Sequence, residues 1–131
     1  MEKWTIRLCE NANGKGYVES DILLTLESKN KLLFDRFFKR MEVLTRRDIF
    51  DLKRGNEIKP LGDAIFEIRF YFNRLHIRLL GYFDYSLSPP TFFALVGFMK
   101  KTNKIPIQKI ELAKERYKEF RNIHKNKTYG F

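Results

Sequence analysis

The chain has 131 residues, of which 44% are hydrophobic, so we expect one folded domain spanning residues 1–131 and exclude an intrinsically disordered protein. The 26 lysines and arginines outnumber the 16 acidic residues, and the net charge of +10 makes a nucleic acid or another polyanion the expected partner. One cysteine excludes an internal disulfide bond, and the longest apolar run, residues 92–99, is too short to cross a bilayer.

The first residues lack the basic and then apolar layout of a signal peptide, so we expect a cytoplasmic protein. Trp4, Ile6 and Leu8 alternate with polar or small residues, which predicts a first strand. After an Asn- and Gly-rich loop, apolar residues at helical spacing predict one helix over 18–26 and a second over 34–44. The two helices are expected to form a hairpin that covers a sheet.

Residues 45–60 read as an irregular connection that can hold a short helical turn. The next two segments, 64–72 and 75–83, each alternate between apolar and polar residues, and only two residues separate them. A two-residue hairpin would pair Phe70 with Ile77 and place both apolar faces on the same side of the sheet. The same register sets Arg69 opposite Arg78 on the other face.

A loop at 84–90 leads to a nearly all-apolar segment, 91–99, whose composition is typical of a central strand covered on both sides. Residues 100–105 are a polar exit, and Pro106 begins a helix whose apolar positions include Ala113 and Phe120. The tail at 124–131 is expected to be mobile. The predicted order is β-α-α-β-β-β-α, an α+β fold with helices packed on one face of a mostly antiparallel sheet.

Chemistry is expected on the cationic face of the central hairpin. The cysteine and the two distant histidines offer no metal-ligand spacing, so no metal or other cofactor is expected. Arg69 and Arg78 can hold phosphates or stabilise the negative charge of a phosphoryl-transfer transition state. RNA carries its own nucleophile, the 2′-hydroxyl, so a ribonuclease of this kind needs only positioning, charge stabilisation and modest proton transfer.

Each residue of this face can also have a role without catalysis. The two arginines can belong to a solvated outer face, and Glu67 can be an ion-pair partner rather than a base. His76 is the residue of this face with an ordinary pKa near neutrality, but it can also be a strand histidine hydrogen-bonded to Tyr71 or to water.

Two motifs resemble the RelE/HigB superfamily of toxins of type II toxin–antitoxin systems, in particular its phage-derived HigB-like branch. They are KPLGDAIFEIRF at 59–70 and GFMKKTNKIPIQKIELAKER at 97–116, with Arg78 between them. The resemblance implies a compact sheet with two N-terminal helices and a C-terminal helix. It also implies a ribosome-dependent endoribonuclease, an mRNA interferase, that is silenced by a cognate helix-turn-helix antitoxin.

The resemblance places Arg69, Arg78 and Lys101, with Lys100 beside the last, where members carry basic residues that contact or cleave RNA. The candidate catalytic residues are Arg69, Arg78, Lys101 and His76. The candidate RNA-binding residues are Lys100, Lys104, Glu67 and Lys59. The interpretation requires the two guanidinium groups to lie side by side without a carboxylate partner. Its alternatives are a non-catalytic protein that binds nucleic acid or poisons a protein target, and a phage accessory protein with no nucleic-acid role.

Overall fold

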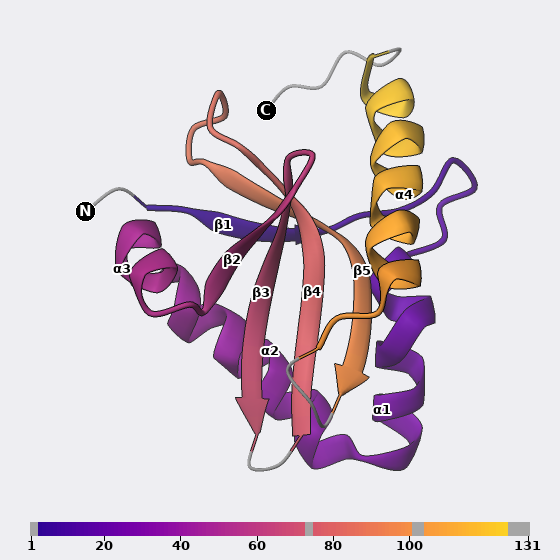
Figure 1. The fold of residues 1–131 in the computed structure, drawn as a ribbon. Coiled ribbons are helices and arrows are strands. Elements are labelled where there is room, and N and C mark those ends of the chain that lie inside the picture. Colours follow the sequence, from indigo (N-terminus) through magenta and orange to yellow (C-terminus); the bar gives the residue numbers. More distant parts are fainter. Residues whose placement is uncertain (1–2, 73–74, 101–103, 126–131) are drawn as a thin grey trace.

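The computed structural model describes residues 3–72, 75–100 and 104–125, the last three of these by their backbone alone. Its centre is a five-stranded sheet in the order β1-β5-β4-β3-β2 (Figure 1). The strands are β1 (Thr5–Leu8), β2 (Ile58–Gly62), β3 (Ile65–Phe72), β4 (Leu75–Asp84) and β5 (Thr91–Lys100). Only β1 and β5 pair in parallel, so the predicted α+β class with a mostly antiparallel sheet is confirmed.

The hairpin of β3 and β4 has the predicted register. Phe70 pairs with Ile77, Arg69 with Arg78, and Tyr71 with His76. Alternation is the cause, because this register alone places the apolar residues of both strands on one face. The two turn residues predicted at 73–74 lie outside the described part of the chain.

The N-terminal helices cover one face of the sheet. They are the π-helical turn η1 (Glu19–Leu23), α1 (Leu24–Lys29), α2 (Lys31–Thr45) and α3 (Ile49–Arg54). The Asn30 side chain accepts a hydrogen bond from the Leu33 amide and so caps α2. The buried ring of Phe37 then packs 5.1 Å from that of Phe70 on β3, and Figure 1 shows α2 running behind β3 and β4.

The opposite face is covered by α4 (Ile107–Lys125). Ala113 and Phe120 of α4 are buried together with Leu80, Leu95 and Val96 of the sheet. The expectation that helices pack on one face therefore holds for η1 to α3, whereas α4 forms a second layer. The physical reason is β5, which is apolar on both sides as predicted and needs cover on both.

Asp21 and Arg116 connect the two helical layers at the edge of β5. The Asp21 carboxylate accepts hydrogen bonds from the Gly97 amide at 3.0 Å and from the Arg116 guanidinium at 2.7 Å. Arg116 also donates to the Leu95 carbonyl at 2.9 Å. Backbone groups of β5 beyond the end of β1 thus find partners that a neighbouring strand would otherwise supply.

Two predicted segments differ from the structure. The connection predicted at 45–60 contains α3, the expected helical turn, and also β2, a strand that was not predicted. The backbone of α4 extends to Lys125, two residues into the tail predicted from residue 124; the mobility of that tail stays a prediction, and 126–131 lie outside the described part. Among the helices described, none has both the length and the apolar character to cross a membrane.

Candidate RNA-binding site

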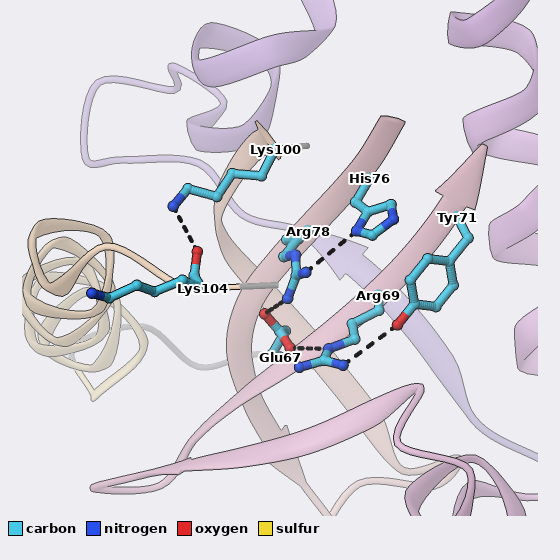
Figure 2. Close-up of polar contacts among 7 residues, drawn as sticks. All are labelled: Glu67, Arg69, Tyr71, His76, Arg78, Lys100 and Lys104. Atoms are coloured by element: carbon cyan, nitrogen blue, oxygen red, sulfur yellow. Dashed lines mark hydrogen bonds and ion pairs between the residues drawn. The ribbon is translucent and has the colours of Figure 1, made fainter. Parts of the chain in front are cut away.

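A polar cluster lies on the face of the sheet that α4 covers, toward the hairpin end of β3 and β4. Alternation directs these side chains away from the N-terminal helices. The polar cluster consists of the residues drawn in Figure 2: Glu67, Arg69, Tyr71, His76, Arg78, Lys100 and Lys104.

The Glu67 carboxylate is the centre of the polar cluster. One of its oxygens, Oε1, accepts from Nε of Arg69 at 2.5 Å, and the other, Oε2, accepts from Nη1 of Arg78 at 2.7 Å (Figure 2). The side chains of Glu67 and Arg78 are both 0% exposed, and that of Arg69 is 12% exposed. Two guanidinium groups and one carboxylate leave a formal charge of +1 in this trio.

The expected pair of uncompensated arginines is therefore wrong, and a cleavage mechanism that needs both guanidinium groups free to hold the phosphate is excluded in this conformation. Arg69 and Arg78 do lie opposite each other, but Glu67 stands two residues before Arg69 on the same face and diagonal to Arg78, within reach of both. The predicted ion-pair role of Glu67 is confirmed. Because Arg78 has no exposed surface, a substrate cannot contact it in this conformation, and its catalytic assignment stays a prediction.

His76 is held between an arginine and an aromatic ring. Its Nδ1 lies 3.4 Å from Nη2 of Arg78, and its ring meets that of Tyr71 edge to face with centroids 4.6 Å apart. Burial lowers the pKa of His76 below its ordinary value, and the charges of Arg78 and Arg69 lower it further. The contact with Tyr71 is thus between rings rather than the predicted hydrogen bond, and His76 hydrogen-bonds with Arg78 instead.

The lysines form the rim of the site. Lys100 pairs with His76 in the register of β4 and β5, and its ammonium group donates to the Lys104 carbonyl at 2.6 Å. The Lys104 side chain is exposed. Lys59 is exposed on β2 and pairs with Glu67 in the register, so it belongs to the same face. Lys101 lies outside the described part of the chain.

Tyr71 belongs to the polar cluster, although the sequence predicted for it only a hydrogen bond with His76 and no part in the site. Its hydroxyl lies 3.4 Å from Nη1 of Arg69, and 45% of the residue is exposed. The signal that could have identified it is the predicted register, which set it opposite His76.

Metal ligands do not gather at this site: within the described residues, no group of three or more His, Cys, Asp or Glu could hold a metal ion. Among the residues of Figure 2, Glu67 alone is acidic, and five others are basic. Such a surface suits a phosphate backbone.

The five-stranded sheet with its helices is compatible with the RelE-like fold. A family model described as phage derived protein Gp49-like (DUF891) matches residues 22–118, a range that includes the whole polar cluster. The chain therefore belongs to this Gp49-like family of phage-derived proteins, which is part of the RelE/HigB-like group of toxins from toxin–antitoxin pairs. No curated protein and no solved structure matches the chain.

Proposed function

We propose that this protein is the toxin of a toxin–antitoxin pair and acts as a ribosome-dependent mRNA interferase. The observation that carries the proposal is that Arg69 of β3 and Arg78 of β4 meet at the buried Glu67 carboxylate, with Lys100 of β5 the register partner of His76 on the same face. Membership of the Gp49-like family and the net charge of +10 support it. Its partners would be mRNA on the ribosome and a helix-turn-helix antitoxin.

In the proposed reaction the 2′-hydroxyl of RNA attacks the adjacent phosphate, and the 5′-oxygen of the next nucleotide leaves. The products are a 2′,3′-cyclic phosphate and a 5′-hydroxyl end. The proton of the 2′-hydroxyl goes to a base, and the leaving oxygen gains a proton. The protein's contribution is positioning and stabilisation of the extra negative charge on the phosphate.

Arg69 is the arginine assigned to phosphate contact. Its side chain retains exposed surface, and no residue of the described part binds its Nη2 group. Lys100, Lys101 and Lys104 would hold the flanking backbone. Glu67 is unsuited to act as the base, because both of its oxygens accept from arginines and neither is exposed.

A second function is favoured by the same carboxylate. Because Glu67 compensates both arginines, the polar cluster can bind RNA without stabilising a pentacoordinate phosphate. In that case the protein is a non-catalytic member of the family that binds nucleic acid or poisons a protein target.

An experiment in a translating extract distinguishes the two functions. We would add the purified protein to an extract programmed with a defined mRNA and map new 5′ ends by primer extension, with the same mRNA free of ribosomes as the control. If the protein is an mRNA interferase, new 5′ ends should appear only on mRNA that is being translated. Arrest of translation with intact mRNA would overturn it in favour of the second function.

A further inference from the structure

The buried guanidinium of Arg78 connects Glu67 to His76. Its Nη1 donates to Oε2 of Glu67 at 2.7 Å, and its Nη2 lies 3.4 Å from Nδ1 of His76. Figure 2 shows the three side chains in this order, with Arg78 in the middle. Arg78 is 0% exposed, as is its partner Glu67.

This contact fixes the proton on the imidazole. Arginine is always protonated and offers only N–H donors, so Nδ1 of His76 must accept. A neutral imidazole that accepts at Nδ1 carries its proton at Nε2. A doubly protonated imidazolium would instead turn an N–H toward the guanidinium.

The positive charges around His76 also favour the neutral imidazole. Arg78 lies beside it on β4, Arg69 and the Tyr71 ring face it from β3, and Lys100 is its register partner on β5. Lys104 follows on the segment before α4, where its carbonyl binds Lys100. Four of the residues named here, Arg78, Arg69, Lys100 and Lys104, are cations, and burial and the two arginines lower the pKa of His76.

We infer that Arg78 is a positioning residue that acts through His76, holding the imidazole neutral with its proton at Nε2, rather than a residue that touches the phosphate. The inference rests on the proposed function for its catalytic meaning: His76 would donate a hydrogen bond to a phosphate oxygen and would not serve as the general base. Glu67 in turn holds Arg78 in place. The rival role for Arg78 is direct phosphate contact after it leaves Glu67.

The test is ¹⁵N NMR of the histidines in the full-length protein without RNA. His124→Gln assigns the signals, because the chain has two histidines. In the wild type we expect the Nε2-protonated tautomer of His76 and a pKa below 6.5. The Nδ1-protonated tautomer would overturn the inference whether or not any variant folds.

Two substitutions extend the test. Arg78→Gln removes the charge, so the pKa of His76 should rise toward 6.5, whereas Arg78→Lys should keep it low. Arg36→Gln, on the exposed surface of α2, is the matched control and should leave it unchanged. An unchanged pKa in a folded Arg78→Gln protein would contradict the inference.

A last measurement uses the cleavage assay. If Arg78 acts through His76, the double variant His76→Ala with Arg78→Gln should cut no more slowly than the slower single variant. Multiplied losses would indicate direct phosphate contact by Arg78. The NMR result does not depend on RNA cleavage, so failure of the proposed function and failure of this inference are distinguishable.

Discussion

Glu67 and Arg78 form an ion pair in which neither side chain has any exposed surface, with 2.7 Å between Oε2 and Nη1. Removing two charges from water is costly, and their attraction offsets that cost only when the geometry is good and further hydrogen bonds are made. Arg69 supplies one such bond to Glu67, and His76 supplies a contact to Arg78. The pair thus organises the whole polar cluster.

Replacement of Glu67 should destabilise the fold severely. Glu67→Gln keeps the shape of the side chain but leaves the buried charge of Arg78 without its carboxylate, at a cost of about 3–5 kcal/mol. Urea unfolding followed by circular dichroism measures the free energy of unfolding. Glu42→Gln on the exposed surface of α2 is the control and should change it by less than about 0.5 kcal/mol. Equal stability of the two variants would show that the pair contributes little.

Replacement of Ala64 by glycine should stabilise the protein. Ala64 follows β2 with a φ of +67°, a left-handed conformation that a Cβ atom disfavours and glycine accepts. We expect a gain of up to about 1 kcal/mol in the free energy of unfolding. Ala12→Gly, in an exposed loop and without a positive φ, should bring no gain. A lower free energy of unfolding for Ala64→Gly would contradict the idea that the left-handed backbone at Ala64 is strained.

Gly81 should not tolerate a side chain. A Cβ atom there would lie 2.0 Å from the Phe93 carbonyl oxygen, at the point where the β4–β5 register shifts. Gly81→Ala must therefore displace β5, and we expect a loss of about 1–3 kcal/mol or more by thermal unfolding. Gly55→Ala, whose Cβ would meet its nearest atom at 3.4 Å, is the control. Similar melting temperatures of the two variants would argue against the close approach of β4 and β5 at Gly81.

The free energy of unfolding should decrease as the pH falls, in part because His76 becomes protonated. Its pKa is lowered in the folded protein, so the unfolded chain binds the proton more tightly and protonation favours unfolding. The stabilising contribution is complete above 6.5, the ordinary value, and is lost as the pH falls through the lowered pKa. His76→Gln should flatten the decrease in the free energy of unfolding between about pH 7 and pH 5. An identical pH dependence in the variant would show that His76 titrates normally.

Sequence patterns predicted the register of β3 and β4 because the alternation of these strands allows only one arrangement with a shared apolar face. They also predicted, from its uninterrupted apolar residues, that β5 is covered on both faces, although the middle strand of the sheet is β4 and β5 lies between it and the edge strand β1. β2 was missed because Pro60 and a register shift near Gly62 break its alternation. The face chosen by α4 could not be predicted, because an amphipathic helix does not indicate which side of a sheet it covers.

Part of the site was predictable as well. The register set Arg69, Arg78 and His76 together, and Glu67 was within reach of an arginine. Burial was not predictable, since it depends on how α4 and the segment before it pack over the sheet. For that reason the compensation of both arginines by one carboxylate emerged only from the structure.

The central claim is that Arg69, held by Glu67 yet still partly exposed, contacts the phosphate that is cut. The most direct measurement is the rate of transcript cleavage by Arg69→Ala in a translating extract, with Arg36→Ala on the opposite side of the sheet as the control. The account predicts a loss of about 100-fold or more for Arg69→Ala and an unchanged rate for the control, both variants being folded by circular dichroism. Cleavage by folded Arg69→Ala at the wild-type rate would contradict the account.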